Sequence, residues 1–250
     1  MREVLATRDF RWLFAVRLIG QFSDGLLQAA LATFVLFSPE RQPDAIKVAT
    51  AFAILLLPYS IIGPFAGVFL DRWRRRDVLV RANLVKSLAT LPIIALVVVG
   101  NDGLLLGLAV LTVLGVGRFV LAGLSASLPH VVSGRDLITA NAFTPTSGTI
   151  AAAIGAVGGI ALRASVGGGG DAGSELVLTL AACGFAASAL AATRIARMKL
   201  GPRGERPADT LRGVAMGMID GIRQLFRAPI AGRAIAVAGA HRVAFGALTV

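Results

Sequence analysis

Residues 104–128 read LLLGLAVLTVLGVGRFVLAGLSASL, a continuous stretch in which Arg118 is the one charged residue. A helix of about 20 apolar residues is long enough to cross the hydrocarbon core of a bilayer. Similar stretches recur along the chain and predict helices over residues 12–37, 48–70, 78–99, 104–128, 137–162 and 176–192, with a seventh from about residue 230 to Val250. We therefore predict an all-α fold, a polytopic bundle of transmembrane helices.

The composition excludes a single soluble domain. Hydrophobic residues make up 56% of the chain, charged residues 16%, and the mean hydropathy is +0.76, whereas soluble domains average about 25% charged residues. The net charge of +11 could suggest nucleic acid, but the basic residues cluster in short loops between apolar stretches. We expect a lipid bilayer as partner, and no nucleic acid. The first apolar stretch is too long for a signal-peptide core, so we expect it to be retained.

Lysine and arginine predict the orientation, because they concentrate in cytoplasmic loops. One side of the predicted bundle carries basic residues in the N-terminus, in the loops at residues 71–76 and 135, and throughout the segment after residue 192. The other side carries only Arg41, Lys47 and Arg163. We therefore predict a multi-pass protein of the plasma membrane with a cytoplasmic N-terminus.

The apolar pattern divides the chain into three parts. Residues 1–192 form a six-helix transmembrane domain, residues 193–229 a cytoplasmic connector, and residues 230–250 the start of a seventh transmembrane helix. Within the connector, apolar residues from Leu211 to Phe226 fall on one face of a helix. This segment is either a basic amphipathic helix on the membrane surface or a helix packed beneath the bundle.

Two of the predicted helices end in similar sequences, which suggests an internal repeat. Residues 63–70 (GPFAGVFL) align with residues 155–162 (GAVGGIAL), and both contain G-x-x-x-G, through Gly63 in the first and through Gly155 and Gly159 in the second. Such glycines let helix backbones approach closely. The two segments would run in opposite directions, as in 3+3 inverted-repeat transporters, although chance similarity between glycine-rich segments is the alternative.

Several polar residues fall inside the predicted helices. Arg17, Gln21, Asp24 and Gln28 share one face of the first helix, because they are spaced by four, three and four residues. A charge at mid-membrane costs about 2.5–3.5 kcal/mol, so Asp24 and Arg118 should face a cavity or a partner. We predict a proton or substrate site there. The alternative is a packing ion pair of Asp24 with Arg118 or Arg17. Asn141 adds hydrogen-bonding capacity to the same predicted cavity.

Enzyme chemistry has no support in the sequence. There is no H-E-x-x-H motif, no pair of intramembrane carboxylates and no Ser/His/Asp cluster. Two histidines and one cysteine are too few for a metal cluster without carboxylate help. We expect no metal, no cofactor and no catalytic residues.

Residues 67–76, GVFLDRWRRR, resemble the signature G-x-L-A-D-R-x-G-R-R of the major facilitator superfamily. Gly67, Asp71, Arg72, Arg75 and Arg76 match the signature, while Phe69, Leu70 and Arg74 depart from it. Arg118 is similar to the arginine of the family's helix 4 motif, and residues 155–159 resemble its helix 5 motif with alanine in place of proline. Gly20-Gln21 and Asp24-Gly25 resemble the branch that holds siderophore and macrolide exporters.

The resemblance implies secondary active transport by alternating access. It implies proton-coupled efflux of a small amphipathic molecule, such as a drug, siderophore or metabolite. Gly67, Asp71, Arg72, Arg75 and Arg76 would form a conformational gate. In this arrangement Asp71 closes the cytoplasmic side by interacting with a helix N-terminus of the second half.

Family members have twelve helices in two six-helix halves, and this sequence supplies six and the start of a seventh. We therefore expect the chain to act with a C-terminal six-helix half or with a second copy. The alternative is a truncated or non-transporting membrane protein that serves as an interaction module.

Overall fold

The computed structural model describes residues 7–31, 73–101, 103–166 and 171–201, together with six single residues between 213 and 240. Within these ranges every regular element is a helix. The helices are α1 (Arg8–Leu31), α3 (Arg75–Val98), α4 (Leu104–Ser127), the 3-10 helix η4 (Leu128–His130), α5 (Leu137–Ser165) and α6 (Asp171–Thr193). The helices predicted over 48–70 and from residue 230, and the amphipathic segment 211–226, lie outside the continuous described ranges.

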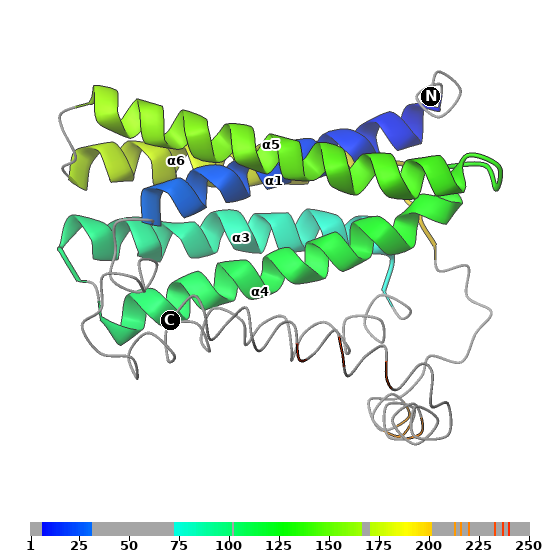
Figure 1. The fold of residues 1–250 in the computed structure, drawn as a ribbon, viewed down its shortest axis with the longest axis horizontal. Helices are drawn as coiled ribbons and strands as arrows, with labels where there is room; N and C mark the ends of the chain where they lie inside the picture. The colour runs from blue at the N-terminus through cyan, green and yellow to red at the C-terminus, as the bar shows by residue number, and fades with distance from the viewer. Residues whose placement is uncertain are drawn as a thin grey trace.

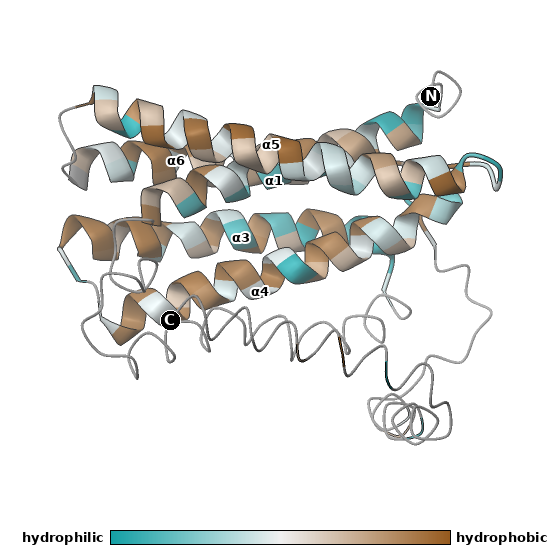
Figure 2. Ribbon diagram, viewed as in Figure 1, coloured by the Kyte–Doolittle hydropathy of each residue, from teal (hydrophilic) through white to brown (hydrophobic). Residues whose placement is uncertain are grey.

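Four of the described helices are long and apolar enough to cross a membrane: Arg75–Val98, Leu104–His130, Leu137–Ser165 and Ala172–Thr193. Figure 2 shows apolar residues along these helices, interrupted midway in α3 and α4 by hydrophilic ones. Helix α1 is equally long but carries the polar stripe that includes Arg17 and Asp24. These spans indicate a multi-pass membrane protein.

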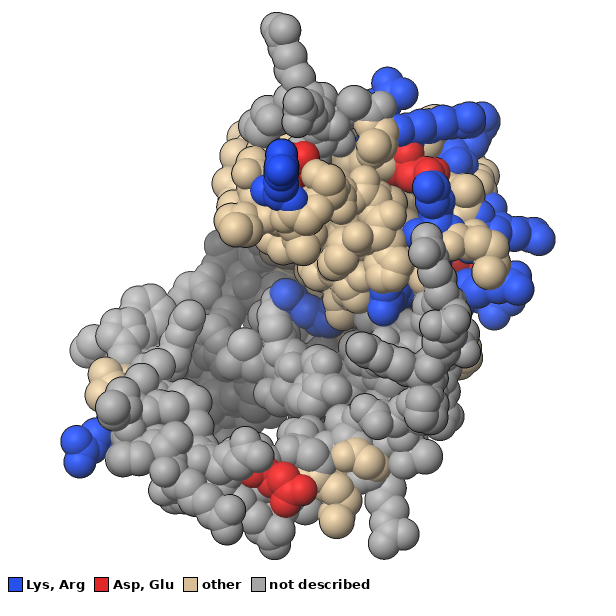
Figure 3. Space-filling view, turned by 90° about the vertical axis from the view of Figure 1, so that its right-hand side faces the viewer, with Lys and Arg blue, Asp and Glu red and all other residues tan. Residues whose placement is uncertain are grey.

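The helices lie side by side along the long axis of the molecule (Figure 1). Helix α1 packs mainly against α5 and α6, and α3 packs mainly against α6 and α4. The chain direction places the N-termini of α1, α3 and α5 at the same end as the C-termini of α4 and α6. We call this end the basic end, because Figure 3 shows Lys and Arg side chains gathered on it.

Main-chain carbonyls at the basic end accept hydrogen bonds from two arginines of α3. Arg75 Nη1 donates to the carbonyl of Ala126 at 2.9 Å and to that of Leu200 at 3.2 Å. Arg76 Nη2 donates to the carbonyl of Thr193 at 2.8 Å. Cations are favoured at helix C-termini, where the last carbonyls have no helical partner. The arginines therefore tie the start of α3 to the ends of α4 and α6.

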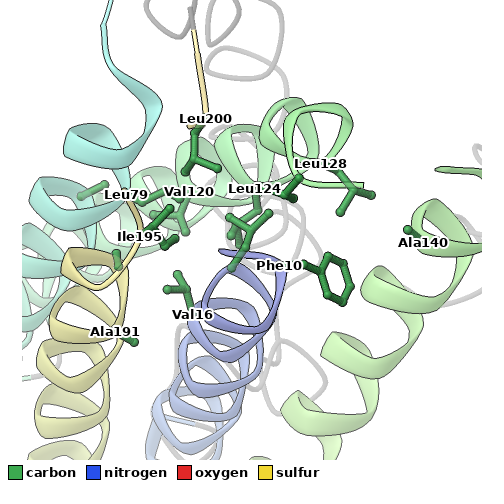
Figure 4. Close-up of a cluster of buried hydrophobic side chains, with 14 residues drawn as sticks. Phe10, Val16, Leu79, Val120, Leu124, Leu128, Ala140, Ala191, Ile195 and Leu200 are labelled. Atoms are coloured by element: carbon green, nitrogen blue, oxygen red, sulfur yellow. The ribbon is translucent and has the colours of Figure 1, made fainter. Parts of the chain in front are cut away.

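Two large apolar clusters form most of the core of the described residues and follow one another along the helix axes. The first surrounds the basic end and includes Phe10, Leu79, Leu124 and Ile195 (Figure 4). The second lies toward the opposite end and includes Leu27, Ile93, Val113 and Phe185. On α1, α3 and α6, buried polar residues lie in the sequence between the members of the first cluster and those of the second. They are Ser23, Asn83, Lys86 and Ser188. A polar layer therefore separates two apolar ones.

The helix ends follow local turn chemistry more closely than hydropathy. Helix α3 ends in a Schellman motif: Gly100 has φ +66°, its N–H donates to Val97, and the N–H of Asn101 donates to Leu96. Helix α6 begins at Asp171, five residues before the predicted Leu176. The prediction began too late because the first turn of the helix is polar and lies outside the apolar pattern.

Candidate functional site

An ion pair joins α1 to α3 at the level of the polar layer. Lys86 Nζ donates to Asp24 Oδ1 at 2.6 Å, and the Lys86 side chain is only 1% exposed while that of Asp24 is 21% exposed. Lys86 lies midway along α3, roughly 17 Å from either helix end at 1.5 Å per residue. An ammonium at this depth needs a partner, because isolated charges are strongly disfavoured in apolar surroundings.

Two further helices complete the surroundings of Lys86. Its ammonium lies 4.0 Å from the centre of the Phe185 ring on α6, within the range of a cation–π interaction. On α4, a Cβ added to Gly117 would lie 3.4 Å from Lys86 Nζ and 4.0 Å from Asp24 Oδ1. The missing side chain at Gly117 leaves the space that both charged groups use.

Arg118 brings a second cation to the same carboxylate. It is half-buried on α4, and its guanidinium interacts electrostatically with Asp24. We call Asp24, Lys86 and Arg118 the charge cluster. The cluster draws one side chain from each of α1, α3 and α4, so a change in its charge state acts on three helices together.

The rest of the predicted stripe on α1 lies in different surroundings. Arg17 is 6% exposed and donates from Nη2 to Ser125 Oγ on α4 at 3.3 Å. Gln21 lies against Gly148 of α5, and its buried Oε1 has no hydrogen-bond partner among the described residues. Gln28 and Asn141 are exposed. The structure therefore brings Asp24 and Arg118 together and leaves Gln28 and Asn141 outside the cluster.

Serine hydroxyls join the helices around the charge cluster. Ser188 Oγ of α6 donates to the carbonyl of Val16 on α1 at 3.0 Å. Ser87 Oγ of α3 donates to the carbonyl of Ala182 on α6 at 2.8 Å. Small polar residues of this kind let membrane helices approach and bond across the interface. Helix α6 therefore sets the spacing between the two helices that carry Asp24 and Lys86.

Glycines bring α1 and α5 into backbone contact. A Cβ on Gly25 would overlap the backbone of Ala152, and a Cβ on Gly155 would overlap that of Phe22. A Cβ on Gly159 would lie 2.8 Å from the Cβ of Ala29. The counterpart Gly63 lies outside the described residues. Since no side chain larger than hydrogen fits at these contacts, they fix α1 closely against α5.

The predicted gate is described only in part. Gly67, Asp71 and Arg72 lie outside the described residues. Arg75 and Arg76 hold the ends of α4 and α6 through the carbonyl contacts given above, and Arg76 also forms an ion pair with Asp77 at 3.1 Å. Both arginines therefore bind within this half of the bundle.

The sequence analysis missed Lys86 as a site residue. The signal was present, because Lys86 lies well inside the predicted helix 78–99 and lysine is as unfavourable there as Asp24 is in the first helix. The sequence does not show which face of α3 turns toward α1, so it did not predict that Lys86 contacts Asp24.

The chain is similar over nearly its whole length to two mycobacterial proteins. It is 37% identical over 248 residues to an uncharacterized MFS-type transporter of Mycobacterium bovis and, to the same degree, to one of Mycobacterium tuberculosis. The match covers 98% of this chain and 56% of each relative, so the chain spans about half the length of the curated relatives it matches. No family model matches the chain, and no solved structure does. The names of both relatives agree with the resemblance of residues 67–76 to the major facilitator superfamily.

Proposed function

We propose that this chain is the N-terminal part of a major facilitator transporter that exports a small amphipathic molecule in exchange for protons. Transport proceeds by alternating access in the plasma membrane, with the basic end in the cytoplasm. The resemblance of Gly20-Gln21 and Asp24-Gly25 to the siderophore and macrolide exporters supports placement in that branch. A C-terminal six-helix half, or a second copy, completes the substrate cavity.

The observation that carries this proposal is the charge cluster inside apolar helices. A buried ion pair is weak evidence for stability, because desolvation of both charges offsets much of their attraction. Ionisable groups at membrane depth are functional by default, as proton relays or substrate sites. Asp24 is the group of the cluster that takes part in proton exchange, since 21% of its side chain is exposed while Lys86 is enclosed.

The gate at the basic end supplies the conformational part of the proposal. Arg75 and Arg76 bind the ends of α4 and α6, so this half can move as one body. We infer from the resemblance that Gly67, Asp71 and Arg72 of the same signature make the contact with the other half. Breaking and remaking that contact would accompany rocking of one half against the other.

Flux measurements on the full-length protein test the proposal. In everted membrane vesicles with an imposed proton gradient, Asp24→Asn should abolish gradient-driven flux of amphipathic test compounds while the protein is still inserted. Asp136→Asn is the matched control, because this carboxylate lies at the basic end and binds Ser133; it should transport normally. Unchanged flux in Asp24→Asn would refute the assignment.

The alternative is a non-transporting membrane protein that acts as an interaction module. It predicts no solute flux from the unmodified full-length protein under any gradient, with normal insertion. The flux experiment therefore separates the two functions before any substitution is made.

A further inference from the structure

We propose that Lys86 is a positioning residue for transport: it is the internal counter-ion of Asp24, and neutralisation of Asp24 releases the link between α1 and α3. This inference rests on the proposed function and adds to it a residue and a step. It assigns to Lys86 a role separate from that of Arg118, which approaches the same carboxylate from α4.

The ion pair provides much of the direct contact between α1 and α3. Helix α1 packs closely on α5 and α6, and α3 on α6 and α4, whereas α1 and α3 are not among the closely packed helix pairs of the described residues. The 2.6 Å contact from Lys86 to Asp24 crosses this gap. Loss of the attraction therefore removes the direct link between α1 and α3, while α6 still holds both helices and the glycine contacts keep α1 on α5.

The two members of the ion pair are unequally buried. Lys86 is 1% exposed and Asp24 is 21% exposed, so a proton or a polar ligand can reach the carboxylate but not the ammonium. Among the described residues, the charged groups with a recorded interaction with Asp24 are Lys86 from α3 and Arg118 from α4. Helix α6 contributes the uncharged ring of Phe185 beside the ammonium.

Uptake of a proton by Asp24 would leave the cations of the cluster without their anion. The carboxylate becomes neutral, and Lys86 and Arg118 remain as two cations around it in a low-dielectric environment. Like charges repel strongly there, and the Phe185 ring replaces only part of the lost attraction. The Lys86 ammonium must then move away from Asp24 or pair with another anion, and either response breaks the direct link between α1 and α3.

A double-mutant cycle tests the energetic link in the full-length protein. Lys86→Met removes the charge and keeps an unbranched chain of similar length, and Asp24→Asn is near-isosteric. Each single variant should lower the melting temperature in detergent by about 5–10 °C, because it breaks the ion pair and leaves the other charged group in place. The double variant should recover part of that loss, since Arg118 remains. Losses that simply add in the double variant would overturn the proposal.

Infrared spectroscopy gives a readout that a purely structural role would not change. Lys86→Met removes the ammonium that donates to Asp24 Oδ1 at 2.6 Å and leaves Arg118 as the other cation of the cluster. The carboxylate stretching bands of Asp24, identified by their loss in Asp24→Asn, should therefore shift in frequency in Lys86→Met. Asp24 bands at unchanged frequency in Lys86→Met would overturn the counter-ion role.

Transport completes the test and separates the two proposals. Lys86→Met should lose gradient-driven flux although it is inserted, while Lys199→Met at the basic end should retain it. Full gradient-driven flux in Lys86→Met would overturn the positioning role. If the unmodified protein shows no flux, the proposed function fails, and the melting and infrared results still decide whether Lys86 is the counter-ion of Asp24.

Discussion

Lys86 is stabilised at membrane depth by two neighbours of different chemistry, the carboxylate of Asp24 and the ring of Phe185. Removal of one partner from a buried ion pair costs about 3–5 kcal/mol, whereas replacement of both is often neutral. The pair is therefore better explained by function than by stability. A carboxylate with one accessible side and one enclosed cation can respond to a proton without unfolding its surroundings.

Gly117 provides a prediction at the scale of a single residue. Gly117→Ala should be tolerated, because the new Cβ would lie 3.4 Å from Lys86 Nζ, an ordinary contact distance. Gly117→Leu should push the ammonium away from Asp24 and destabilise the protein by about 1–3 kcal/mol, as overpacking does. Thermal unfolding in detergent measures both variants. Equal stability of the two would show that the space beside Gly117 is not confined.

The residue scale also shows what the sequence could and could not predict. The spacing of Arg17, Gln21, Asp24 and Gln28 placed a polar stripe on α1, and depth alone singled out Asp24 and Arg118. Prediction of Lys86 as a site residue would have required knowledge of how α3 packs on α6. Ser87 donates to the carbonyl of Ala182 on α6, and the adjacent Lys86 consequently turns toward α1. No hydropathy pattern in α3 encodes that rotation.

Helix α5 supplies a matched pair of glycines at the scale of an element. Gly155→Ala should destabilise the protein by about 1–3 kcal/mol, because its Cβ would overlap the backbone of Phe22. Gly158→Ala, three residues away, meets nothing within 4 Å and should be neutral or stabilising by up to about 1 kcal/mol, since alanine favours the helix. Unfolding measurements that rank the two in reverse order would exclude close contact between α1 and α5.

The end of α3 gives a second element-scale prediction. Gly100 has φ +66° and open space around it, so Gly100→Ala should cost about 1–2 kcal/mol from backbone conformation alone. Gly134→Ala, also in open space but without a positive φ, should cost less. Comparison of the two melting temperatures isolates the conformational effect. A loss at Gly134 as large as at Gly100 would contradict the Schellman assignment.

The positions of the helices were predictable, because an apolar stretch long enough to cross a membrane has few alternatives to a helix. Helices α3, α4 and α5 fall where the stretches at 78–99, 104–128 and 137–162 predicted them. Their ends were less predictable, because a polar first turn is invisible to hydropathy. Helix α3 begins at Arg75, where its arginines bind the ends of α4 and α6, and α6 begins at Asp171.

At the scale of the whole molecule, the basic end predicts orientation. In a variant lacking the single cysteine, Cys183, Arg135→Cys marks the basic end and Asn101→Cys the opposite end; both positions are exposed. An impermeant maleimide should label Asn101→Cys in intact cells and Arg135→Cys only after permeabilisation. The reverse pattern would place the basic end outside the cell.

The glycine-lined contact between α1 and α5 limits which positions of α5 can accept substitutions during evolution. On α5, Gly148, Gly155 and Gly159 face α1, while Ile150, Ile154, Val157 and Ile160 are exposed large apolar residues. The exposed positions can exchange more freely among aliphatic residues, because each of them is more than half exposed. The glycine positions cannot, so descendants of this gene should keep one narrow face of α5 unchanged while its other side diversifies.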